Sequence, residues 1–325
     1  MPTTKNPRHG SMQFWPRKRA KRAYARVRSY AQAKEAKLLG FAGYKVGMTH
    51  VVAKDDRDNS LTKGQNIVIP TTIIECPPLK AASLRFYKTS STGSRLVSEI
   101  LSKNLDKTLS RKLVLPKKDL KKIEDVKDFD EVRVAVHTQP KMIGTGRKKP
   151  ELFELAIGGK KDEQVAYAKE LLGKEIKVSD IFSDGMYIDT HAITKSKGFQ
   201  GPVKRFGVGI LPKKSEKTKR GPGSLGPWVA HAHIQYRVAK AGQMGYHQRT
   251  EYNKQILKIE EDAQKVNPKG GFVNYGLVKS TAVLVHGSVG GSKKRLIRFN
   301  VPIRPTSTNQ DFPQVTSISL SSQQG

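Results

Sequence analysis

Phe41-Ala-Gly-Tyr-Lys-Val-Gly-Met-Thr-His-Val-Val52 is a run of β-branched and aromatic residues interrupted by glycine, which is typical of a β-strand. Further runs of this kind, bounded by turn-forming residues or proline, occur at Asn66–Cys76, Ser83–Tyr87, Met186–Thr194, Gly271–Val278, Thr281–His286 and Arg295–Val301. Many short strands with little helix between them favour a barrel over a parallel sheet. The sequence therefore predicts a mainly β fold, with a barrel built from residues 41–90, 181–195 and 259–304.

Residues 91–180 separate the first strands from the later ones and have a different pattern. Apolar residues recur at roughly helical spacing over Asp119–Phe129 and over Lys161–Leu172, which Gly173 ends. Val132–His137 and Leu152–Ile157 alternate as strands do. We therefore expect a small α/β insertion in the barrel.

Basic charge is concentrated in two segments. Residues 196–258 contain 13 Lys and Arg, two acids, nine glycines and four prolines, and residues 1–40 contain 11 Lys and Arg and the single acid Glu35. Together they carry +21 of the net charge of +32. Neither has a sustained apolar period, and glycine and proline suit backbone that passes close to phosphates. We expect two extended basic arms, and a tail, residues 305–325, that is loose or follows a partner surface.

The charge balance points to the class of partner. A net charge this high is tolerated mainly when a polyanion supplies counter-charge, so nucleic acid is the first candidate. Binding to a membrane surface would require an apolar face opposite the basic one, and neither arm has such a face along its length. The run Arg17–Arg22 is the start of a helix, a patch similar to a nuclear-localisation signal, or a solvated run of charge. No apolar run approaches the ~20 residues that span a bilayer, and no signal-peptide core is found, so we expect a cytosolic protein.

Aromatic residues alternate with cations in the arms. They are Trp15, Phe199, Phe206, Trp228, Tyr236 and Tyr246. Aromatic faces among cations suit stacking on unpaired bases, although any of these residues could instead anchor an arm to the core. For Trp228, which follows Gly226-Pro227 in a segment without a core of its own, the RNA-facing role is favoured.

Motifs for catalysis are weak. Gly221-Pro-Gly-Ser-Leu-Gly226 has the spelling of a dinucleotide-binding turn, but it follows basic residues instead of a strand and leads into Pro227-Trp228 instead of a helix. His231, His233 and His247 have only Glu251 near them as a further metal ligand, so contact with RNA is favoured over a metal site. A nuclease would need clustered carboxylates to hold divalent ions, and the two basic segments contain almost none. We expect no catalytic residue, metal or cofactor, and no small-molecule substrate.

The single cysteine, Cys76, follows an isoleucine-rich run and precedes two prolines. A single thiol excludes an intramolecular disulfide and a cysteine-based zinc cluster. We interpret Cys76 as a small buried hydrophobic residue, with a reactive thiol as the alternative.

Several stretches resemble one family in the same order. They are Pro7-Arg-His-Gly10, Phe14-Trp-Pro-Arg-Lys-Arg-Ala20, Phe41-Ala-Gly-Tyr-Lys-Val-Gly-Met-Thr49, Val134-Ala-Val-His-Thr-Gln139, Thr194-Lys-Ser-Lys-Gly-Phe-Gln-Gly201, Gly226-Pro-Trp-Val-Ala-His231, Val238-Ala-Lys-Ala-Gly-Gln-Met-Gly-Tyr-His247 and Pro268-Lys-Gly-Gly-Phe-Val-Asn-Tyr-Gly276. The family is the universal ribosomal protein L three of the large subunit, in its archaeal and eukaryotic form. The resemblance covers nearly the whole chain.

The resemblance implies a translation-factor-like β-barrel on the subunit surface, with long basic N-terminal and central extensions in ribosomal RNA. It implies that Trp228 lies at the tip of a finger near the peptidyl transferase centre, with His231 at the matching histidine beyond it. Lys219 stands where the eukaryotic pattern has a modifiable histidine, so that modification is not expected. The long eukaryotic C-terminal extension is also missing.

We therefore expect a non-catalytic protein that binds large-subunit RNA in the cytoplasmic ribosome, next to neighbours such as protein L fourteen. A free RNA chaperone or assembly factor and a nucleic-acid enzyme are the alternatives. The expected RNA-binding residues lie in the two arms: Arg8, His9, Trp15, Arg17, Lys18, Arg19, Lys21, Arg22, Lys197, Lys204, Arg205, Lys213, Lys214, Lys217, Lys219, Arg220, Trp228, His231, Arg237, Lys240, His247 and Arg249.

Overall fold

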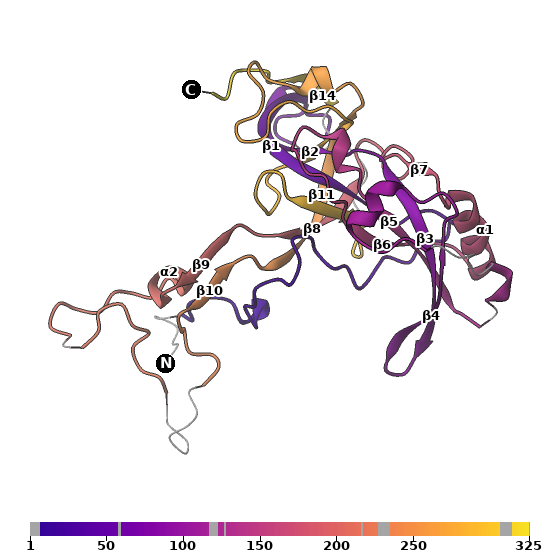
Figure 1. Ribbon diagram of the computed structural model, residues 1–325. Coiled ribbons are helices and arrows are strands. Elements are labelled where there is room, and N and C mark those ends of the chain that lie inside the picture. The colour runs from indigo at the N-terminus through magenta and orange to yellow at the C-terminus, as the bar shows by residue number, and fades with distance from the viewer. Residues whose placement is uncertain are drawn as a thin grey trace. The chain divides into compact units, whose positions relative to one another are not determined.

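A computed structural model of the chain (Figure 1) describes residues 7–57, 60–116, 123–126, 128–215, 217–226, 235–305 and 314–324. The chain forms two compact units. We call Met1–Ala23 with Ile193–Arg249 the arm unit, and Tyr24–Ala192 with Thr250–Gly325 the sheet unit.

A seven-stranded antiparallel sheet forms the centre of the sheet unit. Its strand order is β13 (Leu296–Asn300), β8 (Tyr187–Ile193), β11 (Gln248–Glu260), β12 (Ala282–His286), β2 (Asn66–Glu75), β1 (Gly40–Lys54) and β14 (Gln314–Ile318). β1 also pairs with β13, from Gly40 opposite Asn300 to Tyr44 opposite Leu296. The six strands from β13 to β1 therefore form a closed ring of pairings, which removes most of the exposed sheet edges.

Strand β1 is buried over its first eight residues because apolar groups cover both of its faces. Phe41 and Tyr44 join one hydrophobic cluster, and Val46 and Val51 join a second. A Cβ at Gly43 would lie 2.5 Å from the Cys76 sulfur and 2.7 Å from the Glu75 carbonyl oxygen, so only glycine fits this crossing. Cys76 is buried, as predicted, and burial raises the pKa of its thiol.

The second sheet of this unit has the order β4 (Gly93–Leu101), β3 (Leu79–Ser90), β5 (Glu131–His137) and β6 (Leu152–Ala156), and β7 (Glu175–Ile176) pairs with β3. Helix α1 (Lys161–Leu171) confirms the helix predicted there, and Gly173 follows it with a φ of 82°. The helix predicted over Asp119–Phe129 is wrong in its described part, which holds only the short 3-10 helix Ile123–Asp125. The other 3-10 helices are Met12–Phe14, Lys107–Arg111, Pro140–Met142 and Ala263–Val266.

The strand predicted over Gly271–Val278 is also wrong, because its backbone groups pair with one another in tight turns: the N–H groups of Tyr275 and Gly276 donate to the Phe272 carbonyl oxygen at 3.0 and 2.9 Å. Side chains from outside the segment fix its C-terminal end. The buried Glu75 carboxylate accepts hydrogen bonds from the backbone N–H groups of Lys279 (2.8 Å) and Ser280 (3.0 Å), and from the Tyr275 hydroxyl. The Asn267 side chain bonds both the N–H and the carbonyl of Val278, at 2.8 and 3.0 Å. The segment is consequently a loop held from two sides.

Two segments expected to lack regular structure form strands. The tail contributes β14, which extends the edge of β1 where β13 stops, and Val315 and Ile318 pack on the second cluster. The end of the expected central arm contributes β11, whose residues Ile256 and Leu257 are buried. Both strands depend on a neighbouring strand that local sequence does not reveal.

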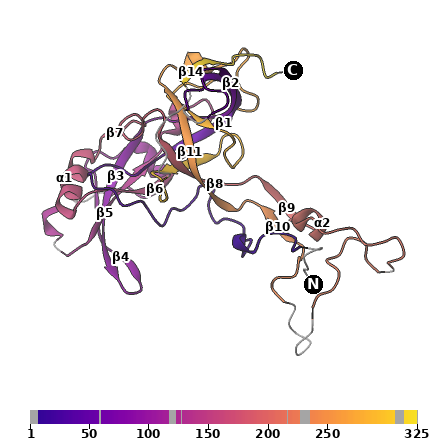
Figure 2. The same ribbon diagram turned by 180° about the vertical axis from the view of Figure 1, so that it is seen from behind.

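The arm unit has little regular structure. β9 (Ser196–Gln200) and β10 (Gly242–Gly245) pair as a two-stranded sheet, and α2 (Pro202–Phe206) follows β9, as Figure 2 shows from behind. Gly207 ends α2 with a left-handed φ of 69°, a conformation that glycine adopts readily. Among the described residues of the chain, no helix has the length and apolar character needed to cross a membrane.

Candidate nucleic-acid interface

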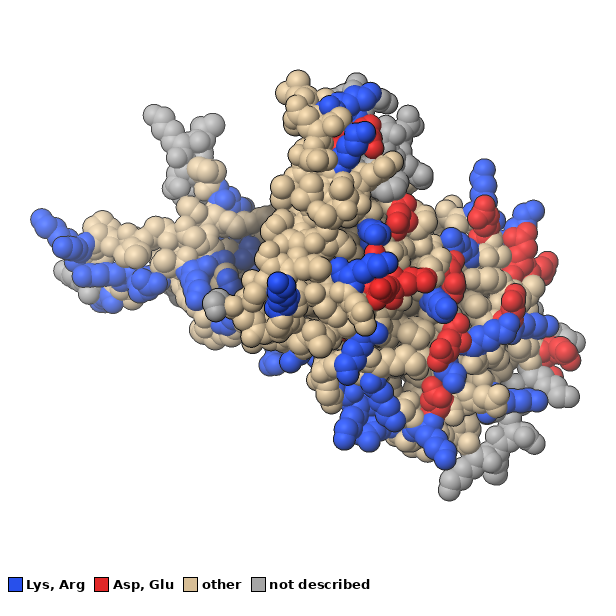
Figure 3. All heavy atoms as spheres, turned by 90° about the horizontal axis from the view of Figure 1, so that it is seen from above, with Lys and Arg blue, Asp and Glu red and all other residues tan. Residues whose placement is uncertain are grey.

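The arm unit is almost free of acidic residues. Its segments contain 19 Lys and Arg, and Glu216 is their one acid. Figure 3 shows blue side chains without red along this unit on the face in view, whereas red and blue alternate over the sheet unit. Carboxylates of the arm unit therefore cannot balance its charge.

Some of these cations pack inside the arm unit. Arg17 lies over the Phe206 ring, with Cζ 4.4 Å from the centroid, and Arg205 lies over the same ring at 5.0 Å. The Arg205 guanidinium donates to the carbonyl oxygens of Gln243 (3.0 Å) and Lys240 (2.8 Å). Burial and the neighbouring arginines lower the pKa of both guanidinium groups. Backbone carbonyls and one aromatic face thus take the place of carboxylate partners.

Trp15 belongs to the same cluster. Its ring centroid lies 5.8 Å from that of Phe206 and 6.2 Å from that of Tyr236. Arg8 stacks over Trp15 at 5.7 Å and donates to the Arg237 carbonyl oxygen at 2.9 Å. Trp15 thus packs against residues of the central segment within this unit, an arrangement that differs from the anchor to the core considered from the sequence.

His247 is buried, although we expected it to contact RNA. Its Nδ1 lies 2.8 Å from the Lys18 carbonyl oxygen, and its backbone N–H donates to Thr194 Oγ1 at 3.1 Å. Burial lowers the pKa of its imidazole. In this structure His247 joins the two segments of the arm unit, and it presents little surface to a ligand.

Most of the other expected RNA-binding residues are exposed. They are His9, Lys18, Arg19, Lys21, Arg22, Lys197, Lys204, Lys213, Lys214, Lys217, Lys219, Arg220, Arg237 and Lys240. Arg249 is half-buried over the Phe14 ring at 4.7 Å. Trp228, His231 and His233 lie outside the described residues.

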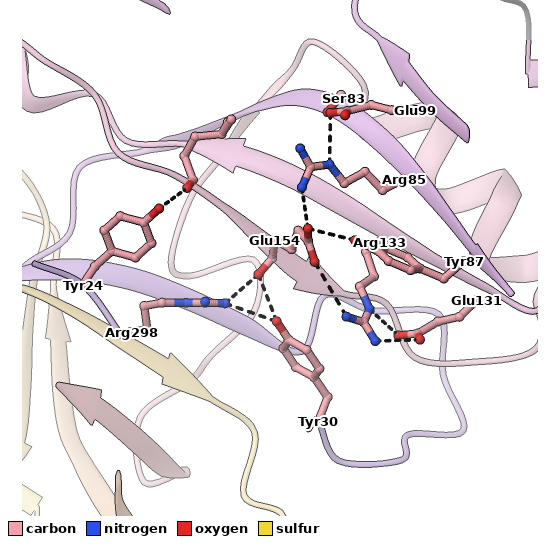
Figure 4. Close-up of polar contacts among 11 residues, drawn as sticks. Tyr24, Tyr30, Ser83, Arg85, Tyr87, Glu99, Glu131, Arg133, Glu154 and Arg298 are labelled. Atoms are coloured by element: carbon pink, nitrogen blue, oxygen red, sulfur yellow. Dashed lines mark hydrogen bonds and ion pairs between the residues drawn. The ribbon is translucent and has the colours of Figure 1, made fainter. Parts of the chain in front are cut away.

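A polar network in the sheet unit was not foreseen from the sequence (Figure 4). The Glu154 carboxylate accepts from the Tyr87 hydroxyl at 2.9 Å and pairs with Arg85 and Arg133. Burial favours a raised pKa for Glu154, but the hydrogen bonds from Arg85 and Tyr87 outweigh it and lower that pKa. The Glu154 carbonyl oxygen accepts from the Tyr30 hydroxyl at 3.0 Å. Tyr30, which we expected in the N-terminal arm, is therefore hydrogen-bonded to strand β6 of the sheet unit.

The described residues contain no group of three or more His, Cys, Asp or Glu placed to hold a metal ion. Most ionisable residues with shifted pKa values in the sheet unit lie in ion pairs or in the core. His191, for example, is buried beside Arg298, and burial lowers its pKa to about 4. The acid-poor arm unit is therefore the candidate interface.

Comparison with known proteins shows the family of the chain. The sequence model of the family "Ribosomal protein L3" matches residues 1–325. The chain is 48% identical over 326 residues to large ribosomal subunit protein uL3 of Archaeoglobus fulgidus, an alignment covering 98% of each protein. It is 47% identical over 330 residues to the protein of the same name from Methanobrevibacter smithii, again over 98% of each. The chain belongs to the ribosomal protein L3 family.

Proposed function

We propose that this chain is a structural, non-catalytic component of the large ribosomal subunit in the cytoplasm, where it binds and orders large-subunit RNA. The observation that carries the proposal is the arm unit, with 19 Lys and Arg against one acid in a member of this family. RNA phosphates would supply the counter-charge that the unit lacks, and releasing their counterions would drive binding.

The cations of the arm unit divide into two roles in this proposal. Arg17 and Arg205 shape the unit from inside, through Phe206 and backbone carbonyls. Exposed residues such as Lys18, Lys21 and Lys204 face solvent and contact phosphate. A packed framework of arginine and aromatic residues holds the exposed cations at fixed spacing, which reduces the entropy lost on binding.

We assign the finer roles on the family resemblance. The closed ring of strands β13, β8, β11, β12, β2 and β1 supports a translation-factor-like barrel, with residues 91–180 as its insertion. Strand β3, which we expected within the barrel range 41–90, pairs instead with strands of the insertion, and β11 joins the ring from the expected central arm. This barrel would lie at the subunit surface beside proteins such as L fourteen. Residues 1–40 and 196–258 would enter the RNA. Trp228, with His231 beyond it, would support the peptidyl transferase centre and the region where tRNA is accommodated.

Sedimentation tests the proposal against its alternatives. Cells expressing the tagged chain are lysed, and large subunits are washed in high salt and sedimented. A structural component stays at one copy per mature large subunit. Release by the wash, or enrichment on immature particles, would indicate an assembly factor instead. Turnover of RNA by the purified chain alone would indicate an enzyme.

A further inference from the structure

A cavity of about 210 Å³ opens in the sheet unit beside the end of strand β12. β12 stops at His286, opposite Thr71, and the next N–H, of Gly287, donates to the Pro70 carbonyl oxygen at 2.8 Å. β2 and β11, on either side of β12, both extend past this point. The gap between them is the cavity.

The cavity has an apolar floor and a polar rim. Ile69 and Leu257 belong to the second hydrophobic cluster, and Ile67 packs against it. Arg57, Gln255 and His286 form the rim. Gln255 is 9% exposed, and its Nε2 has no hydrogen-bond partner within the described residues. A buried amide donor without a partner is costly, so this donor favours a ligand that accepts a hydrogen bond.

The cations at the rim are already paired. Arg57 donates from Nε and Nη2 to the two carboxylate oxygens of Asp55, each at 2.8 Å, which fixes its guanidinium. The Lys254 ammonium, whose charge acts on His286, forms an ion pair with Glu251, with Nζ 3.5 Å from Oε2. Burial, with Lys254 and Arg57, lowers the pKa of His286 and favours the neutral imidazole. The site thus offers hydrogen-bond donors with little uncompensated charge, which suits an uncharged acceptor better than a phosphate or a carboxylate.

We propose that this cavity receives one unstacked base of the large-subunit RNA, one with an exocyclic carbonyl, such as uracil or guanine. The cavity is smaller than the ~300 Å³ at which drug-sized ligand sites begin, and so suits a single base. The ring would rest on Ile67, Ile69 and Leu257, and a base carbonyl would accept from Gln255 Nε2. An aliphatic side chain from a protein partner would leave that donor unpaired. The inference rests on the proposed RNA-binding function and extends it to the sheet unit, which the sequence interpretation did not include.

Ultraviolet crosslinking of washed large subunits that carry the full chain tests the inference. Nucleotide adducts, mapped by mass spectrometry, are expected on peptides containing Gln255 or His286. Gln255→Met keeps the side-chain length and removes the donor. We expect it to reduce the adduct about three- to tenfold, the effect of one hydrogen bond, and to make the crosslinked base more reactive to a carbodiimide probe. Gln264→Met changes an exposed glutamine of the same unit and should have neither effect.

The outcomes separate the two proposals. Adducts on arm-unit peptides alone, with Gln255→Met equal to the wild type, overturn the base site and leave the RNA-binding function standing. A crosslink from the cavity peptides to another protein overturns it in favour of a protein occupant. Absence of the chain from washed subunits overturns both.

Discussion

The guanidinium of Arg17 lies over the Phe206 ring at 4.4 Å and donates to the Arg205 carbonyl oxygen at 3.2 Å, whereas the next residue, Lys18, directs an exposed side chain to solvent. Neighbouring cations of the same basic run therefore have different environments. Their contributions to RNA binding should differ accordingly.

Changing Lys18 and Lys21 together to Ala should flatten the salt dependence of RNA binding by the full chain. Each phosphate contact to a single strand contributes about 0.7 to the log–log slope, so we expect a loss of about 1.4 units. Arg17→Ala, the matched change within the run, should leave the slope nearly unchanged and reduce amide-exchange protection around Phe206. Equal slopes for the lysine variant and the wild type would show that this run is merely solvated.

His191 should make the sheet unit sensitive to acid. Its pKa is lowered from 6.5 to about 4, so the folded unit binds the proton less well than the unfolded chain. The stabilisation is present above pH ~6.5 and is lost as the pH falls towards 4, by at most about 3.4 kcal/mol. Denaturant unfolding of His191→Asn should show a smaller loss over this range than the wild type, while His9→Asn, at an exposed position, should match the wild type. Parallel curves for all three proteins would rule out His191 as the source.

Tyr275→Phe should destabilise the sheet unit by about 1.5–3 kcal/mol, the typical contribution of a hydrogen bond to a charged group. The change removes the hydroxyl that donates to the buried Glu75 carboxylate and leaves that carboxylate with its backbone donors only. Tyr252→Phe removes a hydroxyl from an exposed ring and should change the free energy of unfolding by less than about 0.5 kcal/mol. Similar values for the two variants would show that the loop around Tyr275 does not depend on Glu75.

Trp228→Ala should leave the sheet unit folded and the chain in the large subunit, since one stacking contact is worth about 1–3 kcal/mol. Under the proposed function, subunits carrying the variant should be altered in aminoacyl-tRNA binding to the A site or in peptide-bond formation. Both steps can be measured on purified ribosomes. Normal values for both would refute the finger role, and loss of the variant from purified subunits would make Trp228 a structural anchor.

Strands that carry their own pattern could be predicted from the sequence. Phe41–Val52 and Thr281–His286 lie in β1 and β12, as predicted. Their apolar residues favour a buried strand whichever strands pair with them. β14 could not be predicted, because its residues pair only where β1 offers an open edge. The Gly271–Val278 segment has strand composition, but the backbone groups of Phe272, Tyr275 and Gly276 bond one another in tight turns, and the distant Glu75 carboxylate holds the backbone just beyond the segment.

Composition predicted which segments form the candidate interface. It did not predict which of their cations are exposed and which pack inside the arm unit. Charge and aromatic content identify the arm segments, and most cations of the described part are exposed, as solvated charges should be. Composition does not separate a lysine that faces solvent from an arginine that packs on a ring. The one available signal was the interleaving of Phe14, Phe206 and Tyr246 with arginine, since cation–π contacts require both partners.

Strand β1 has a consequence for the order of events during synthesis. During translation β1 is made early, yet Gly40 pairs with Asn300 and Val51 with Ile318, so two of its three partner strands are made much later. Pairing between such distant residues is slow, and an unpaired strand edge meanwhile favours aggregation. The ring of strands can close only after residue 300 has been translated. Until then β1 depends on β2 alone, and a nascent chain halted before residue 296 should be markedly more prone to aggregate than the released protein.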